Sequence, residues 1–142
     1  MHPVKLLAVF AENKLGQTAR ITKLLADAGI NIRFATIANS GAFGVMKLLV
    51  ADPERARDEL HAHGLMASFL EVLPVEVEDR PGALHAIAAC LAENGINLDN
   101  TGGFVANGRA IIVVGTHAIE QAHAALSARG MRVLSREELL GL

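Results

Sequence analysis

Apolar and polar residues along the first half of the chain predict six elements in the order strand, helix, strand, strand, helix, strand. Residues 4–10 form a nearly unbroken apolar run, which is typical of a strand covered on both faces. Between residues 16 and 28 the apolar positions recur at close to helical spacing. Ile30, Ile32 and Phe34 then alternate with Asn31, Arg33 and Ala35, as in a half-buried strand. The remaining predicted elements are a strand at 45–50, a helix at 52–63 and a strand within 65–72.

The boundaries of these elements carry turn and cap signals. Gly29 follows the first helical pattern and supplies the left-handed conformation in which helices often end. Residues 40–42 (Ser-Gly-Ala) predict a turn between two strands. Asp52 is the expected N-cap of the second helix, with Pro53 at its first position.

The second half of the chain repeats the same order of elements. Asn107-Gly108 is a strong signal for a tight hairpin between two of its strands. The predicted elements are strands at 73–77, 96–105, 110–116 and 131–134, helices at 82–94 and 119–129, and a short helical turn after Ser135.

The two halves are a tandem duplication, because similar segments recur at one constant offset. Residues 12–16 (ENKLG) return 66 positions later as residues 78–82 (EDRPG). Residues 25–32 (LADAGINI) return at the same offset as residues 91–98 (LAENGINL). The offset also maps Leu60, Ala62 and Gly64 onto Leu126, Ala128 and Gly130 without a gap. We therefore expect two repeats, residues 1–70 and 71–142.

A βαββαβ unit is the ferredoxin-like arrangement, so the predicted fold class is α+β. Right-handed crossovers place both helices of such a unit on one face of an antiparallel sheet. A unit of about 65 residues buries only about 60% of its unfolded surface and is marginal alone. The central strands of each repeat are apolar at nearly every position, so their helix-free face needs a cover. The cover is either the other repeat or a second chain, and we predict a homodimer.

Composition narrows the classes of function. Thirteen Lys and Arg against fifteen Asp and Glu, with no Trp or Tyr and only five Phe, disfavour a nucleic-acid-binding surface. No apolar run approaches the roughly 20 residues that a bilayer requires, and no secretory signal begins the chain. The only cysteine, Cys90, has no partner, so nothing indicates an oxidising compartment. We expect a cytoplasmic protein without a membrane partner.

The duplicated segments resemble the signature of the ACT domain. Asp79-Arg80-Pro81-Gly82 before a helix, followed by residues 92–98 (AENGINL) entering a strand, carry the resemblance most clearly. Residues 13–16 with 29–32 match nearly as well, so the resemblance covers both repeats and essentially the whole chain. It implies a regulatory protein that binds a free amino acid between paired domains and modulates a separate enzyme of amino-acid metabolism.

The same resemblance nominates the ligand-binding residues. In ACT domains the site joins the first strand-to-helix loop of one domain to the second-strand region of its neighbour. The residues that match these positions are Glu12, Asn13, Leu15, Gly16 and Asn31 in the first repeat, and Asp79, Arg80, Pro81, Gly82 and Asn97 in the second. Leu15 stands where the second repeat has Pro81, so the first loop is expected to be less rigid and one site to be weak or vestigial.

These residue types suit a zwitterion. Unpaired N–H groups and a partial positive charge at a helix N-terminus can receive a carboxylate, and a glycine lets it approach the backbone. Carboxylate or amide oxygens of Glu12, Asp79, Asn13, Asn31 or Asn97 can accept from the ammonium group.

Purely structural roles remain open for the same residues. Asn13 and Asp79 are good helix N-caps, and Pro81 suits a first helical turn. Asn31 and Asn97 can instead pair with a neighbouring backbone edge where the two repeats meet.

Catalytic and metal-dependent functions have little support. Cys90 lies mid-helix among apolar residues, an inert packing position, and no phosphate-binding or dinucleotide loop follows a strand. We therefore expect no enzyme activity and no cofactor. The spacing of the six histidines suggests no zinc site. His85, one turn into the helix after the second loop, can touch a ligand or simply be exposed. The rival to the sensor hypothesis is a ligand-independent interaction module.

Overall fold

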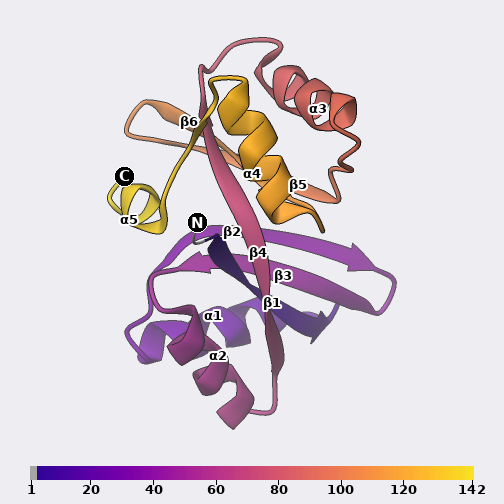
Figure 1. The fold of residues 1–142 in the computed structure, drawn as a ribbon. Helices are drawn as coiled ribbons and strands as arrows, with labels where there is room; N and C mark the ends of the chain where they lie inside the picture. Colours follow the sequence, from indigo (N-terminus) through magenta and orange to yellow (C-terminus); the bar gives the residue numbers. More distant parts are fainter. Residues whose placement is uncertain (1–2) are drawn as a thin grey trace. The chain divides into compact units, whose positions relative to one another are not determined.

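The computed structural model describes residues 3–142, and the chain divides into two units. One unit is Lys5–Leu70, and the other is Glu71–Leu142 together with residues 3–4. Figure 1 shows both units and the labels of their elements. We call them the first and the second repeat.

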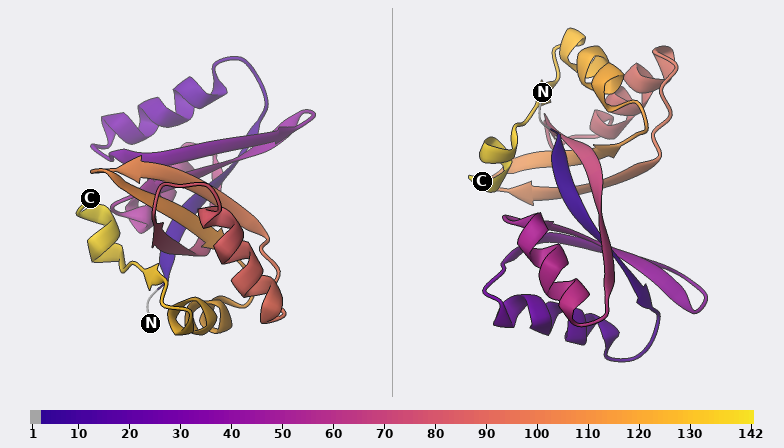
Figure 2. Two further views of the ribbon diagram at one scale, coloured as in Figure 1. Left: turned by 90° about the horizontal axis from the view of Figure 1, so that it is seen from above. Right: turned by 60° about the horizontal axis from the view of Figure 1, so that its bottom comes forward.

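The first repeat is a four-stranded antiparallel unit with two helices. Its elements are β1 (Val4–Glu12), α1 (Gln17–Asp27), β2 (Ile32–Ser40), β3 (Phe43–Val50), α2 (Pro53–Ala62) and the start of β4 (Met66–Val77). The strand order β2-β3-β1-β4 is that of a ferredoxin-like sheet. Both helices cover one face of the sheet (Figures 1 and 2). The core between them contains Leu7, Val9, Ile21, Leu25, Leu48 and Leu60.

The second repeat has the same order of elements. It consists of the end of β4, α3 (Ala83–Glu93), β5 (Asn100–Ala106), β6 (Arg109–Gly115), α4 (Ile119–Ala128), β7 (Arg132–Val133) and the short helix α5 (Arg136–Leu140). The strand order is β7-β4-β6-β5, which is again ferredoxin-like. The core contains Leu73, Val75, Ile87, Leu91, Val114 and Leu126. The predicted α+β class with two βαββαβ repeats is confirmed.

Two strand predictions need correction. The strands expected within 65–72 and at 73–77 are one strand, β4, because no glycine or turn-forming pair interrupts residues 66–77. The strand expected from Ile96 begins only at Asn100. The Asp99 carboxylate accepts from Asn97 Nδ2 at 2.6 Å and from the His117 N–H at 3.2 Å. The bond from Asn97 is local, and the bond from His117 ties Asp99 to the residues after β6. The Asp99 N–H still donates to the Gly115 carbonyl at 2.9 Å, at the point where the ladder of β5 and β6 begins.

The predicted cap and hairpin signals are confirmed. The Asp52 carboxylate accepts from the Arg55 N–H at 3.1 Å at the start of α2. Asn107 and Gly108 have φ values of 52° and 71°, the left-handed pair that a type I′ hairpin requires. In the part of the chain that the structure describes, no helix has the length and apolar composition needed to cross a membrane.

Candidate functional site

The loops that open the first helix of each repeat have the same backbone hydrogen bonds. The Lys14 N–H donates to the Glu12 carbonyl at 3.1 Å, and the Arg80 N–H donates to the Glu78 carbonyl at 2.9 Å. The side chains repeat the pattern, since Lys14 pairs with Glu12 at 3.5 Å and Arg80 with Glu78 at 2.7 Å. The 66-residue offset therefore preserves the loop structure as well as the sequence.

Both helices begin at a glycine in the left-handed conformation. Gly16 and Gly82 are the N-caps, with φ values of 83° and 91°, and neither helix has a side-chain cap. The reading of Asn13 and Asp79 as N-caps is therefore wrong, and Pro81 precedes the cap instead of standing in the first turn. The first N–H of each helix is already used, since Gln17 donates to the Lys14 carbonyl at 3.2 Å and Ala83 to the Arg80 carbonyl at 3.3 Å. No side chain occupies the helix start, so the N–H groups of the next two residues are the ones available to a ligand.

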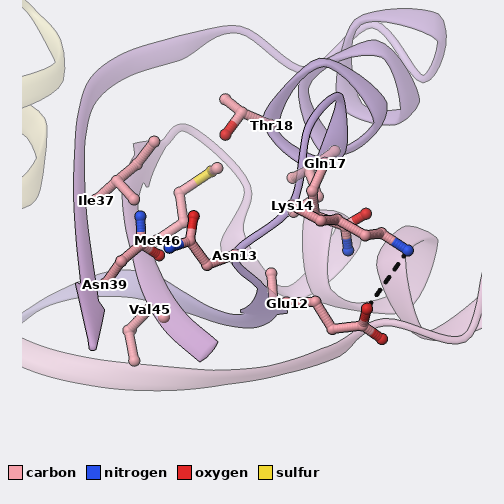
Figure 3. A pocket seen from close by; sticks show the side chains of 12 residues that line it. Glu12, Asn13, Lys14, Gln17, Thr18, Ile37, Asn39, Val45 and Met46 are labelled. Atoms are coloured by element: carbon pink, nitrogen blue, oxygen red, sulfur yellow. Dashed lines mark ion pairs between the residues drawn. The ribbon is translucent and has the colours of Figure 1, made fainter. Parts of the chain in front are cut away.

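A small cavity lies beneath the start of α1 in the first repeat. Its free volume is about 40 Å³, and its wall combines the β1–α1 loop, the first turn of α1 and the hairpin strands β2 and β3 (Figure 3). The lining residues are Ala11, Glu12, Asn13, Lys14, Gln17, Thr18, Ile21, Ile37, Asn39, Gly44, Val45 and Met46. The wall of the cavity thus combines amide, hydroxyl, ammonium and carboxylate groups with apolar side chains.

Gln17 is the most informative residue of this cavity. Its side chain is only 7% exposed, and it is the one buried polar residue among residues 3–142. Within that range no residue forms a hydrogen bond with its amide, whose atoms reach the cavity instead of being sealed in the core. An amide that opens into a small cavity and has no protein partner takes its hydrogen bonds from water or from a ligand.

Two asparagines complete the polar wall. Asn13 Nδ2 donates to the Gly41 carbonyl at 3.0 Å and the Asn13 N–H donates to the Ala42 carbonyl at 2.8 Å, which ties the loop to the β2–β3 turn. Asn39 stands opposite Gly44 across the two strands. A Cβ on Gly44 would lie 1.9 Å from Asn39 Oδ1, so the glycine makes room for this amide.

The residues predicted in the first repeat have different positions relative to the cavity. Glu12 and Asn13 line it, and Gly16 is the cap residue beside it. The Leu15 side chain is fully exposed. Asn31 precedes β2, at the end of the strand opposite to Asn39, and does not line the cavity.

The residues predicted in the second repeat have separate surroundings. Arg80 lines a separate groove. Asp79, Pro81 and Gly82 line neither that groove nor the first-repeat cavity. Asn97 donates to Asp99 within its own loop.

Sequence reasoning missed Gln17, Thr18 and Asn39. The available signal was a difference between the repeats, since the 66-residue offset places Ala83, Leu84 and Val105 at the corresponding positions. These equivalent positions are therefore polar in the first repeat and apolar in the second. Of the three residues only Gln17 is buried, and only the folded chain shows that all three line one cavity.

A cluster of ion pairs lies in the second repeat, around Glu76. Its carboxylate accepts from Arg109 Nε at 2.5 Å and Nη2 at 2.7 Å, and from Arg132 Nη1 at 2.8 Å. The hydrogen bond from Arg109 lowers the pKa of Glu76, burial opposes this shift, and the charges of both arginines lower the pKa further. The pKa of Glu138 is also lowered, mainly by the hydrogen bond from the Ser135 backbone N–H and to a smaller extent by Arg132.

This cluster predicts a pH-dependent contribution to stability. Because the folded-state pKa of Glu76 lies below 4.5, its contribution is present above that pH and is lost as the pH falls through the lowered value. Glu76→Gln should therefore destabilise the protein near neutral pH and progressively less in acid. Urea unfolding at a series of pH values measures this, with Glu120→Gln on the exposed side of α4 as the control. A gap between wild type and Glu76→Gln that stays constant down to about pH 3 would contradict the assignment.

Among the described residues, neither the cysteine nor a metal-binding cluster lies at the cavity. Cys90 is fully buried, and its Sγ donates to the Ala125 carbonyl at 3.5 Å. Over residues 3–142 no three His, Cys, Asp or Glu side chains gather in a way that could hold a metal ion. The arrangement suits reversible binding of a small polar molecule.

Comparisons with known proteins identify the family of the chain and structures with the same fold. The family model described as an ACT domain pair matches residues 2–142. The solved structure of protein BT0572 from Bacteroides thetaiotaomicron is similar, with a TM-score of 0.91 at 26% identity, over 99% of this chain and 97% of that chain. No curated protein matches the chain.

Regulatory subunits of aspartate kinase have the same fold. The ligand-free subunit from Thermus thermophilus has a TM-score of 0.65 at 19% identity, over 89% of this chain and 90% of that one. The subunit from Thermus flavus has a TM-score of 0.63 at 14% identity, over 89% and 93%.

Proposed function

Since the chain belongs to the family of ACT domain pairs, we propose that it is a non-catalytic sensor of a free amino acid. The ligand binds at the first-repeat cavity and changes the activity of a separately encoded enzyme of amino-acid metabolism. The observation that carries the proposal is Gln17, a residue only 7% exposed whose amide has no protein partner and opens into a cavity at a helix N-terminus.

The groups around the cavity are complementary to a zwitterion. The α-carboxylate is received by the N–H groups of Thr18 and Ala19 in the first turn of α1, with the Lys14 ammonium at the same rim. The α-ammonium donates to the side-chain oxygens of Asn39, Glu12 or Asn13. Gln17 presents both a donor and an acceptor, so it serves either end of the ligand.

The size of the cavity limits how the ligand is held. A volume of about 40 Å³ holds a few water molecules or one end of an amino acid. The charged head therefore enters, and the side chain of the ligand stays at the mouth beside Ile37, which is half exposed. This position favours amino acids with small side chains.

The family and the fold support the proposal of a regulated partner. Proteins described as regulatory subunits of aspartate kinase share the fold of this chain. We propose that this chain likewise acts on another polypeptide, and that ligand binding at the cavity controls this action.

An exposed apolar pair supports the predicted homodimer. Phe10 and Phe43, on neighbouring strands, are 50% and 67% exposed. The offset places Glu76 and Arg109, an ion pair, at the same positions of the second repeat. We propose that the Phe10–Phe43 surface meets a second copy of the chain. A module that only interacts with proteins would use the same surface without a ligand.

A thermal-shift screen against the twenty amino acids tests the sensor. An extrinsic dye reports unfolding because the chain has no Trp or Tyr. At a hundred-fold excess over Kd, the ligand should raise Tm by about 5–10 °C. Sedimentation of the same samples reports whether the ligand changes the association state. A flat screen at millimolar concentration would reject the sensor and leave the interaction module.

A further inference from the structure

The second repeat contains two Asn-Gly dipeptides, and their surroundings in the folded chain differ. Asn94-Gly95 follows α3, and Asn107-Gly108 is the turn between β5 and β6. In such a pair the backbone nitrogen of the glycine can attack the side-chain amide of the asparagine, because glycine has no Cβ to hinder the approach. Asparagine is accordingly one of the thermolabile residues of proteins. The rate of the attack depends on how firmly the structure holds the two nitrogen atoms.

Both nitrogen atoms of the first pair are held by hydrogen bonds. Asn94 Nδ2 donates to the Cys90 carbonyl at 2.8 Å, and the Asn94 N–H donates to the Leu91 carbonyl at 3.1 Å. The Gly95 N–H donates to the Ala92 carbonyl at 3.0 Å. The amide that would leave and the nitrogen that would attack must therefore each lose a bond to the end of α3 before they can react.

The second pair has neither restraint. Asn107 and Gly108 are exposed, and within residues 3–142 neither the Asn107 side-chain amide nor the Gly108 N–H forms a hydrogen bond. Asn107 is also the one residue other than glycine in that range with a positive φ, 52°. A side chain makes this left-handed conformation costly, and the tip of a hairpin opens locally with little loss of contacts. The two nitrogen atoms are therefore free to meet.

We propose that Asn107 is a site of spontaneous deamidation, and that the fold protects Asn94 from the same reaction. The Gly108 nitrogen gives its proton to a base from the solvent and forms a bond to Asn107 Cγ, while the Cγ–Nδ2 bond breaks. Ammonia leaves with a proton taken from water, and a cyclic imide joins the two residues. Water then opens the ring at one of its two carbonyl carbons, which gives aspartate or isoaspartate. Water is the only co-reactant.

The modification changes the β5–β6 hairpin. Either product adds a carboxylate two positions before Arg109, whose guanidinium pairs with Glu76. Isoaspartate also lengthens the main chain by one methylene, so the two-residue turn no longer fits the pairing of Ala106 with Arg109. Because β5 follows β6 at the end of the strand order, the disturbance is confined to the edge of the second repeat.

Peptide mapping of the full chain by mass spectrometry, after incubation in mildly alkaline buffer, tests the proposal. Cleavage before Asp99 places the two Asn-Gly pairs in different peptides. The mass gain from NH₂ to OH should appear at Asn107 about tenfold or more faster than at Asn94, because hydrogen bonds must break only at Asn94. In guanidinium chloride, which removes the folded structure, the two positions should react at similar rates.

One variant and one enzymatic assay provide the controls. Asn107→Gly keeps a dipeptide that suits a type I′ turn, and it should show no mass gain at this position. An isoaspartate-specific methyltransferase should label aged wild type far more than the equally aged Asn107→Gly. Equal rates at Asn94 and Asn107 in the folded chain, or a mass gain at Asn107 only after unfolding, would overturn the proposal.

Discussion

Replacing Gln17 by alanine is expected to abolish the amino-acid-dependent rise in Tm without lowering the Tm of the free protein. The Gln17 residue is 7% exposed, and no residue among 3–142 hydrogen-bonds to its side-chain amide. Its removal therefore takes no protein–protein hydrogen bond from the free state. A lost bond to a charged ligand group contributes about 1.5–3 kcal/mol, which weakens binding by about tenfold or more.

Two readouts separate this ligand role from a structural one. A Gln17 that only packs the core would lower the free-protein Tm when truncated, and the ligand would still raise it. Alanine stands at the equivalent position of the second repeat, Ala83, so the helix start tolerates it. Gln121→Ala, on the exposed face of α4, is the matched control and should retain the full ligand response. An unchanged ligand response in Gln17→Ala would remove the cavity from the proposed function.

Replacing Gly44 by alanine should cost both stability and ligand binding. The new Cβ would lie 1.9 Å from Asn39 Oδ1 and 2.8 Å from the Ala38 carbonyl oxygen, so the amide must leave its position and the strand must shift. Overpacking of this kind destabilises by about 1–3 kcal/mol. Urea unfolding measures the loss of stability, and calorimetry measures the loss of affinity for the amino acid that the screen identifies.

The second repeat suggests the compensating change. It has Val105 and Ala110 where the first repeat has Asn39 and Gly44. The double variant Asn39→Val with Gly44→Ala should therefore recover much of the lost stability, because no amide remains for the new Cβ to displace. It should not recover ligand binding, since the polar wall has lost an amide. Recovery of both properties would show that Asn39 does not contact the ligand.

The duplicated pattern was enough to predict the fold, because each element depends on short-range rules. Apolar spacing, the Asp52 cap and the Asn107-Gly108 turn act over a few residues, and the structure contains all three. The predicted boundaries and caps were wrong where another interaction competed with the local rule. Asp99 holds its loop through side-chain bonds and delays β5. Gly16 takes the cap position that Asn13 was expected to fill.

The candidate site was predictable only in part. The repeated loop pointed to Glu12 and Asn13, and both line the cavity. Gln17 and Asn39 could not be chosen from the sequence, because a Gln at a helix start and an Asn near a hairpin are ordinarily exposed. Gln17 matters because the residue is buried and its amide has no protein partner, and Asn39, which is exposed, matters because it lines the same cavity.

The sequence by itself determined that this chain is two ferredoxin-like repeats with matching loops. Periodicity and turn residues are written into neighbouring positions, so they can be read without a structure. The tertiary structure decided on which side of the first helix of each repeat a cavity or groove lies. The first repeat keeps a small polar cavity at Gln17, and the second has a wide groove at Ala86. A cavity depends on which side chains from distant segments fill a shared space, and no local pattern records that.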